Sequence, residues 1–439
     1  MDQASTISCE PGTLYFRCNI CGELSQTALD RLGREQASCK GCGSSPRMRA
    51  VIHVLSTQLF GKNLLLSDFP ARPDIRGLGM TDWEGYASRL AEKFTYQNTY
   101  YHQEPRLDIS AVEIPVQFLA NDFIISSEVF EHVVPPVSRA FENVSKMLKP
   151  RGLFILIVPY MKNKETVEHF PELYDFTVVE DHEAFLLKNE TREGVFQEFR
   201  NLVFHGGPGA TLEMRVFSEN SIIQHLRNAG FHAIQVHHEP DFAHGVWWPQ
   251  AWALPISARS NALPTITASP NPVAVGEGAG STMITWDTGD DTVGYVYISV
   301  NDREEILFAR SPQGSSTANW ILTGSSYEFR LYNSDHTKLL DKVVVTKLSK
   351  IAPTLRAFPN PVPAGEDAGK TTISWDTGDG SVGQVYISTN GGEESLFAAS
   401  CRGSVAANWL LSGRDYEFRL YNSDHTKLLE RVVATKATQ

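Results

Sequence analysis

The chain is poor in cysteine, in long apolar runs and in basic residues, and each shortage excludes a class of protein. Only six of its 439 residues are cysteine, and because four of these form two CxxC pairs, a disulfide framework is excluded. The longest apolar run, "LFILIVPY" from Leu153 to Tyr160, has the length of a buried strand and falls short of the roughly 20 residues of a membrane span. The 51 acidic residues outnumber the 39 basic ones, which makes nucleic acid an unlikely partner.

The amino terminus also lacks the features of a targeting segment. "MDQASTISCEPG" contains neither the basic stretch nor the apolar core of a signal peptide. We therefore expect a cytoplasmic location and no membrane partner. The length exceeds that of one ordinary hydrophobic core and predicts two to four domains.

Four cysteines have the spacing of a metal site. Cys18 and Cys21 form one CxxC pair, and Cys39 and Cys42 form a second. Each pair can place two thiolates on one ion, and four thiolates complete a closed tetrahedral zinc site. A redox pair or free thiols are the alternative, but redox CxxC motifs occur singly. We predict structural Zn²⁺ in a scaffold or substrate-recognition element. The two remaining cysteines, which show no such spacing, are Cys9 and Cys401.

The region that follows, residues 46–259, alternates helical and strand patterns. This alternation predicts a mostly parallel sheet with helices on both faces. The expected helices are "SPRMRAVIHVLSTQLF", "EGYASRLAEKF", "PPVSRAFENVSKMLKP" and "SENSIIQHLRNAGF". The expected strands are "NLLLSD", "RGLGMTD", "DFIISSE", "GLFILIVPY" and "HAIQVHHE".

Glycine is missing from one part of this region where a nucleotide-binding sheet usually has it. Two apolar runs, "LLL" and "GLGM", are each followed by a carboxylate, yet no glycine occurs from Lys62 to Arg76. Either both runs are strands, or "GLGMTDWEGY" alone forms the first strand and its turn. We favour two strands, because that register gives "LLLSD" a place in the sheet.

Residues 260–439 contain a tandem repeat. "SPNPVAVGEGAGSTMITWDTGDDTVGYVYIS" returns as "FPNPVPAGEDAGKTTISWDTGDGSVGQVYIS", and "YEFRLYNSDHTKLL" occurs twice without change. Short alternating strands between Gly, Asp, Asn and Pro turns predict one small antiparallel β-sandwich per copy. Its tryptophans are expected to pack in the core, with contact to carbohydrate as the alternative; they are Trp286, Trp320, Trp375 and Trp409.

The segment from Leu107 to Pro159 carries a resemblance. It contains an acidic residue before a loop, the strand-like "DFIISSE" followed by "VFEHV", and "LKPRGLFILIVP". In this order the motifs resemble class I S-adenosylmethionine-dependent methyltransferases of type 11. "CKGCGSSPRMR" is similar to the lead-in of zinc-ribbon members of that class. The two repeats resemble immunoglobulin-like or fibronectin-like modules appended to bacterial enzymes.

The resemblance implies S-adenosylmethionine as cofactor and assigns residues to it. Asp82 would bind the ribose hydroxyls, and Asp108 the adenine amine, with the Ile109 amide on a ring nitrogen and Trp83 as a stacking wall. In place of the family's glycine-rich turn, Ser67 and Asp68 would hold the amino group of the cofactor. The full set is Ser67, Asp68, Phe69, Asp82, Trp83, Asp108, Ile109 and Ser127.

Two histidines are candidates for catalysis. His132 follows the strand "DFIISSE", where open α/β sheets place their ligands, and could act as a general base or serve structure alone. His205 lies in the glycine-rich "VFHGGPGATLEMR", which is either a functional lid or a tight connection. In "HHEPDFAHGVWWPQAW" we expect aromatic packing or a pocket wall in preference to a metal site.

Together these inferences describe a multidomain bacterial enzyme. The expected domains are a zinc ribbon (1–45), a Rossmann-like methyltransferase domain (46–259) and two β-sandwich repeats (260–349 and 350–439). The methyl acceptor would be an oxygen or nitrogen of a sugar or other polar metabolite, and the repeats would contact protein or carbohydrate. The alternative is a non-catalytic binding or assembly protein with a degenerate methyltransferase domain.

Overall fold

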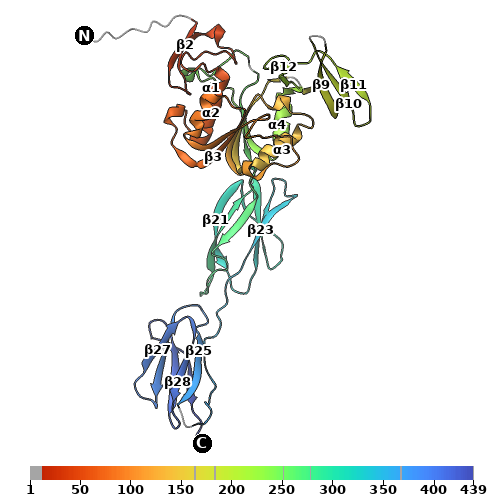
Figure 1. Ribbon diagram of the computed structural model, residues 1–439. Helices are drawn as coiled ribbons and strands as arrows, with labels where there is room; N and C mark the ends of the chain where they lie inside the picture. Colours follow the sequence, from red (N-terminus) through yellow and green to blue (C-terminus); the bar gives the residue numbers. More distant parts are fainter. Residues whose placement is uncertain are drawn as a thin grey trace, which may run out of the picture. The chain divides into compact units, whose positions relative to one another are not determined.

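The computed structural model describes residues 12–162, 165–181, 184–250, 252–276, 278–365 and 368–438. Cys9 lies outside these residues, and so does most of the amino-terminal segment on which the prediction about targeting rests. The chain divides into two compact units, Met1–Leu263 with Gly289–Asp291 and Pro264–Thr288 with Thr292–Gln439. Figure 1 shows the chain coloured along its sequence. Among the helices of the described ranges, none has the length and apolar character needed to span a membrane.

The first unit begins with a small hairpin and a helix. Strands β1 (Thr13–Arg17) and β2 (Leu24–Ala28) pair antiparallel, and the 3-10 helix η1 (Leu29–Arg31) follows. Helix α1 (Pro46–Phe60) begins where the sequence signals it, because Ser45 caps it by accepting from the Met48 amide and proline occupies its first turn. Gly61 ends it with a left-handed φ of 62°.

A six-stranded sheet forms the centre of this unit, in the order β15-β16-β6-β5-β3-β4. Four of its strands, β4, β3, β5 and β6, are parallel, and β16 and β15 continue the sheet antiparallel. The carboxyl ends of the four parallel strands therefore share one edge of the sheet. The strands are β3 (Arg72–Met80), β4 (Phe94–Thr99), β5 (Asn121–Ser127), β6 (Leu148–Ile157), β15 (Phe231–Val236) and β16 (Ile256–Ser260).

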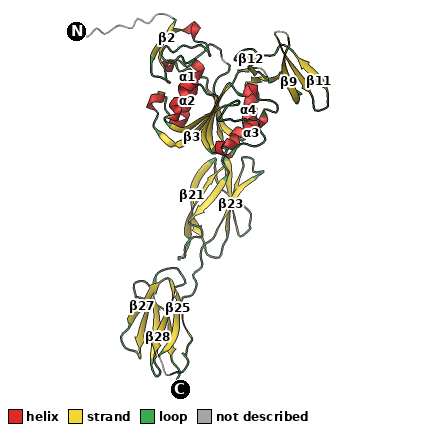
Figure 2. Cartoon of the chain, viewed as in Figure 1, coloured by secondary structure: helices red, strands yellow, loops and turns green. Residues whose placement is uncertain are grey.

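Helices cover both faces of the sheet, as Figure 2 shows. Alternate residues of β5 point to opposite faces: Ile124 joins the core with α3 and α4, while Phe123 and Ile125 join the core with α1, α2 and the cysteine segment. The predicted α/β alternation is thus confirmed for this unit. The other helices are α2 (Glu84–Ala91), α3 (Ser138–Met147), α4 (Glu219–Asn228), η3 (Val116–Phe118), η4 (Phe130–His132) and η5 (Phe242–His244).

One predicted strand of this region was wrong. "LLLSD" forms no strand; Leu66–Asp68 is a short 3-10 helix, η2, whose Leu66 amide donates to the Asn19 carbonyl. The central position beside β5 belongs to β3 instead. The register in which "GLGMTDWEGY" forms strand, turn and helix is therefore the one that the chain adopts.

Between β6 and α4 the chain builds small sheets that the sequence patterns did not predict. They surround a separate core formed by Phe170, Leu187, Leu212 and Met214. The strands are β7 (Tyr160–Met161), β8 (Val167–Glu168), β9 (Asp175–Asp181), β10 (Ala184–Glu190), β11 (Phe196–Phe199), β12 (Phe204–His205), β13 (Thr211–Leu212) and β14 (Arg215–Ser218).

The second unit consists of antiparallel strands in two copies of one arrangement. Each copy has a three-stranded and a four-stranded sheet, and both sheets of a copy contribute to one core. The first copy contains β17 (Thr265–Ser269), β18 (Gly280–Asp287), β19 (Gly294–Val300), β20 (Ile306–Ser311), β21 (Gln313–Ile321), β22 (Tyr327–Tyr332) and β23 (Leu339–Val345). The second contains β24 (Thr354–Phe358), β25 (Gly369–Asp376), β26 (Gly383–Thr389), β27 (Ser395–Ser400), β28 (Arg402–Leu410), β29 (Asp415–Tyr421) and β30 (Leu428–Thr435).

The four tryptophans of the repeats divide into two pairs. Trp286 and Trp375 are buried in the cores, as predicted. Trp320 and Trp409 are 38% and 42% exposed, so the prediction of core packing was wrong for these two. Each of them lies against a tyrosine of its own repeat, with ring centroids 5.4 and 5.2 Å apart.

Candidate functional site

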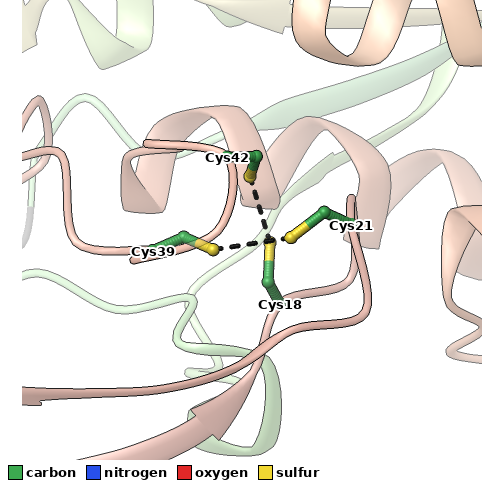
Figure 3. A group of neighbouring side chains, drawn as sticks. All are labelled: Cys18, Cys21, Cys39 and Cys42. Atoms are coloured by element: carbon green, nitrogen blue, oxygen red, sulfur yellow. Dashed lines mark hydrogen bonds between the residues drawn. The ribbon is translucent and has the colours of Figure 1, made fainter.

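The four predicted metal ligands lie together. One sulfur from each of Cys18, Cys21, Cys39 and Cys42 is within 4.8 Å of the other three, with Sγ–Sγ distances of 3.7 Å between Cys18 and Cys42 and 3.5 Å between Cys21 and Cys39 (Figure 3). Zinc–sulfur bonds of about 2.3 Å in a tetrahedron place sulfurs about 3.8 Å apart. The four thiols therefore fit one zinc ion.

The segment after the cysteines is anchored by a buried arginine. Arg49 is fully buried, and its guanidinium donates to the carbonyls of Ser44 and Gly245 and to Ser38 Oγ. It also lies 4.5 Å from the ring centroid of Phe16. Arg49 thus serves packing and is inaccessible to an outside anion.

Arg47, by contrast, reaches the carboxyl edge of the sheet. Its Nη1 donates to Ser127 Oγ at 2.7 Å, and its Nε donates to Glu35 at 2.7 Å. Arg34 forms a second link to the same edge through Glu128, with Nη2–Oε1 at 2.5 Å. The pKa of Glu35 is lowered by these two arginines in spite of its partial burial. The cysteine-bearing segment is therefore joined to the end of β5 by charged hydrogen bonds.

Two residues at this edge have an unusual backbone. Thr81, which follows β3, and Glu128, which follows β5, have φ of 57° and 59°. A left-handed conformation is costly for residues with a side chain, above all for β-branched threonine, and such residues concentrate at functional sites. The turn after β3 continues into half-buried Trp83, whose ring lies over Gly85.

Asp82 belongs to the same turn but faces the interior. It is 6% exposed, and its two carboxylate oxygens accept from the hydroxyls of Tyr86, at 2.8 Å, and Tyr96. Burial raises the pKa of Asp82 to about 7, although both tyrosines and the charge of Arg47 act to lower it. Gly79 leaves room for this arrangement, because a Cβ there would lie 2.0 Å from Tyr96 Oη. Both oxygens predicted to bind ribose are thus already hydrogen-bonded within the protein.

Asp108 and Ile109 lie in the loop between β4 and β5. Asp108 is half-buried, and its Oδ1 accepts from the Ser110 amide at 2.8 Å and from Ser110 Oγ at 2.6 Å. The carbonyl of buried Ile109 accepts from Asn143 Nδ2 of α3 at 2.9 Å. These bonds fix the loop while leaving Asp108 Oδ2 for another donor.

The remaining predicted cofactor residues lie elsewhere. Ser67 and Asp68 are exposed and bonded to each other, and the Ser67 carbonyl accepts from Lys93, which precedes β4. Phe69 is buried against Phe94, at the start of the same strand. The structure therefore places this trio beside the amino end of β4 and does not bring it together with Asp82 or Asp108.

The two predicted catalytic histidines do meet. Their rings are perpendicular, with centroids 4.6 Å apart. His132 Nδ1 lies 2.8 Å from the Leu212 carbonyl, and His205 Nε2 lies 2.9 Å from Glu213 Oε2. Burial lowers the pKa of His132, which favours a neutral ring.

The histidines directly after β15 line a separate pocket together with His53 of α1. Its walls include His53, His237, His238, Trp247 and Trp248, in agreement with the expected pocket wall. Trp248 is also buried against Ala50, so aromatic packing occurs there as well.

Sequence reasoning missed the carboxylates of the site. Glu128 and Glu131 occur in the quoted "DFIISSE" and "VFEHV", but only Ser127 and His132 of these segments were assigned to the site. Their positions directly after a strand were the available signal. Arg34 and Glu35, by contrast, carry no local pattern, since their contacts with Glu128 and Arg47 depend on the fold.

Residues 85–156 match the methyltransferase domain family. The methyltransferase match begins at Gly85, in the first turn of α2, and ends in β6. It includes Asp108, Ser127 and His132, but it leaves out the glycine-poor stretch before β3. A search of curated proteins finds no significant match to the chain.

Solved structures resemble parts of the chain at low identity. The CurJ carbon methyltransferase aligns at 15% identity with a TM-score of 0.30, over 49% of this chain and 55% of that one. The DszA carbon methyltransferase aligns at 13% with a TM-score of 0.28, over 48% and 52%. A segment of two fibronectin type III domains from chicken tenascin aligns at 10% with a TM-score of 0.17, over 39% and 96%. The chain thus spans about half the length of each of the two methyltransferase structures.

Proposed function

We propose that the α/β unit is an S-adenosylmethionine-dependent methyltransferase that methylates an oxygen or nitrogen of a polar acceptor such as a sugar. The observation that carries this proposal is the methyltransferase match over residues 85–156, which runs from the first turn of α2 to β6. The polar residues at the carboxyl edge of the sheet lie within or directly beside that segment, where open α/β sheets bind their ligands.

The carboxyl edge fits a polar cofactor. Ser126 Oγ, near the end of β5, is buried and has no hydrogen-bond partner among the described residues. Together with the left-handed Thr81 and the open Oδ2 of Asp108, this orphaned hydroxyl supports a missing ligand at the ends of β3 and β5. Asp108, Ile109, Ser127 and the backbone from Thr81 to Trp83 would hold S-adenosylmethionine there.

When bound, this cofactor supplies a methyl group already activated on a sulfonium. The protein then has to bind the acceptor, orient its nucleophilic atom and exclude water. His132 and His205 lie beyond the end of β5 and would receive or hold the acceptor proton. Because His132 is held neutral by burial, its Nε2 could accept that proton.

We also propose that the cysteine cluster binds a structural zinc ion. The sulfur spacing supports a closed site that contributes folding energy and offers no open position for chemistry. Through Arg47 and Arg34, this segment would hold the end of β5 in place. We propose that the repeats are immunoglobulin-like, which their paired three- and four-stranded sheets support. Their contact with protein or carbohydrate is a further proposal, which the half-exposed Trp320 and Trp409 support.

A second candidate is a binding protein whose methyltransferase domain no longer takes the cofactor. The engagement of both Asp82 oxygens with Tyr86 and Tyr96 favours it, because the carboxylate predicted to bind the ribose is already hydrogen-bonded within the protein. The turn after β3, "TDWEG", has a single glycine where the family has a glycine-rich turn, which points the same way.

Calorimetric titration separates the two candidates. With the zinc-loaded full chain, S-adenosylmethionine and S-adenosylhomocysteine should both bind, and Asp108→Ala should weaken both by roughly 10- to 100-fold, the effect of a lost hydrogen bond to a charged group. Asp74→Asn is the matched control, because Asp74 is exposed at the amino end of β3. No binding to the zinc-loaded wild type would rule out the enzyme and leave the binding protein.

A further inference from the structure

One buried carboxylate at the site makes no hydrogen bond within the part of the chain that the structure describes. Glu131 is fully buried, and among the described residues neither of its side-chain oxygens takes part in a hydrogen bond. An isolated buried carboxylate is strongly unfavourable, and protonating it would still leave a buried hydroxyl without an acceptor. A cation bound beside the carboxylate would satisfy this position.

Two histidine nitrogens face this carboxylate at a distance unlike that of a hydrogen bond. His132 Nε2 and His205 Nδ1 lie 3.6 and 3.7 Å from Glu131 Oε1. One ligand atom from each of the three residues falls within 4.8 Å of the others. Ligand bonds of about 2.0–2.2 Å give separations of about 3.0–3.6 Å between neighbouring ligands of one ion. The three side chains thus have nearly the spacing of a common metal ion.

Each imidazole also presents the correct nitrogen. His132 Nδ1 donates to the Leu212 carbonyl at 2.8 Å, so its Nε2 keeps a lone pair. His205 Nε2 donates to Glu213 Oε2 at 2.9 Å, so its Nδ1 keeps one. These lone pairs belong to the two nitrogens that face Glu131. A carboxylate or carbonyl behind the imidazole is the usual way in which proteins fix a metal-binding histidine.

Hydrogen bonds tie together the segments that carry these ligands. Glu131 and His132 come from η4, directly after β5, whereas His205 comes from β12, at the start of the glycine-rich hairpin labelled in Figure 1. The Met214 amide donates to the Glu131 carbonyl at 2.8 Å. Buried Arg215 donates to the carbonyls of Phe130 and Val133, at 3.0 and 2.6 Å. Together with the hydrogen bond between His132 and the Leu212 carbonyl, these contacts fasten the hairpin and the residues directly after it to the turn after β5.

We infer that Glu131, His132 and His205 bind a divalent transition-metal ion, separate from the ion of the four cysteines. Two imidazoles and one carboxylate suit zinc, manganese, cobalt or iron. Three protein ligands leave at least one coordination position open, as in catalytic metal sites.

The open position deepens the proposed function, on which this step rests. It suits an oxygen ligand, so the acceptor would be a hydroxyl compound in preference to an amine. Coordination lowers the pKa of a hydroxyl. With their lone pairs on the ion, His132 and His205 would no longer receive the proton, which would pass to solvent water instead. The acceptor oxygen would form the new C–O bond, and the sulfonium C–S bond would break with its electron pair remaining on sulfur.

Equilibrium dialysis of the full chain against Zn²⁺ tests the site. Two zinc ions per chain are expected for the wild type and one for His205→Ala. The matched control is His169→Ala, which should keep two, because His169 donates to the other oxygen of Glu213 but lies outside the three-residue group. A single ion in the wild type, or two in His205→Ala, would overturn the inference.

Two further measurements distinguish loss of the metal site from loss of the fold, and one metal site from the other. If circular dichroism shows that His205→Ala is unfolded, Glu131→Gln keeps the side-chain shape and should likewise bind one ion. Cobalt substitution distinguishes the sites by colour, since only the cysteine site produces an intense thiolate-to-cobalt band, and that band should survive in Glu131→Gln. Two metal sites in a chain that binds no S-adenosylmethionine would refute the proposed function while retaining the metal site.

Discussion

Arg47 donates a hydrogen bond of 2.7 Å from Nη1 to Ser127 Oγ. Arg47 lies in the first turn of α1, shortly after the last cysteine of the cluster, and Ser127 is the final residue of β5. The ion pair of Arg34 with Glu128 makes a parallel link one residue further on. The conformation of the cysteine-bearing segment and that of the carboxyl edge of the sheet therefore depend on each other.

Zinc removal is accordingly expected to weaken cofactor binding. Without the ion, the cysteine loops lose their cross-link, and Arg47 and Arg34 lose their fixed positions against β5. Calorimetric titration of His205→Ala, which keeps only the cysteine site, before and after chelation should show a drop in S-adenosylmethionine affinity of about tenfold, or about 1.4 kcal/mol, reversed by added Zn²⁺. Cys401→Ser, at an exposed cysteine outside the cluster, should behave as the wild type. Unchanged affinity in verified zinc-free protein would disprove the coupling.

The buried carboxylate of Asp82 predicts an unusual dependence of stability on pH. Its folded-state pKa, about 7, lies above the ordinary value near 4, so the folded protein binds the extra proton. This contribution to stability is fully present below about pH 4 and is lost as pH rises to about 7, by on the order of 4 kcal/mol. Asp82→Asn cannot ionise and should lose nothing over that range.

This prediction is tested by the difference in the free energy of unfolding between the wild type and Asp82→Asn. Urea unfolding of the wild type and Asp82→Asn at pH 5, 6, 7 and 8 should show the variant gaining stability relative to the wild type as pH rises. Asp74→Asn serves as the control, because the Arg72 guanidinium lowers the pKa of exposed Asp74 and the slope should not have this sign. A constant difference for Asp82→Asn would mean that Asp82 is ionised throughout.

Two glycines of β3 allow a matched comparison. A Cβ at Gly79 would meet Tyr96 Oη at 2.0 Å and Asp82 Oδ2 at 2.4 Å, whereas a Cβ at Gly77 would meet the Phe123 ring at 2.1 Å. Both alanine variants should be destabilised, by about 1–3 kcal/mol for overpacking. Only Gly79→Ala should also alter the pH dependence assigned to Asp82, and an equal change in both variants would contradict this assignment.

Much of the α/β unit could be predicted because its signals are local. The Ser45 cap and Gly61 stop define α1, and the Ser218 hydroxyl, which accepts from the Ser221 amide, begins α4. The strand "DFIISSE" is apolar on both faces, as its burial between two cores requires. The cysteine spacing likewise depends on short turns that the sequence itself contains.

The failures have a different origin. "LLLSD" has the composition of a strand, but its place in the sheet is taken by β3, whose glycines fit against Phe123 and Tyr96. No local pattern decides such a competition. Asp82 ends an apolar run as a ligand-binding carboxylate would, yet the two tyrosines that bind it are four and fourteen residues away. Partners of this kind become visible only when the chain is folded.

The tryptophans of the repeats provide a last test, because each repeat contains one buried and one half-exposed ring on neighbouring strands. Trp286→Ala empties a core site and should cost about 3–5 kcal/mol. Trp320→Ala should cost less, by buried area about three-fifths as much, because 38% of this residue already faces solvent. Calorimetric unfolding of the full chain measures both, and Trp375→Ala and Trp409→Ala repeat the comparison in the second copy. Equal costs within each pair would contradict this division of the rings, whereas unequal costs would leave Trp320 and Trp409 as the rings free to stack on a sugar.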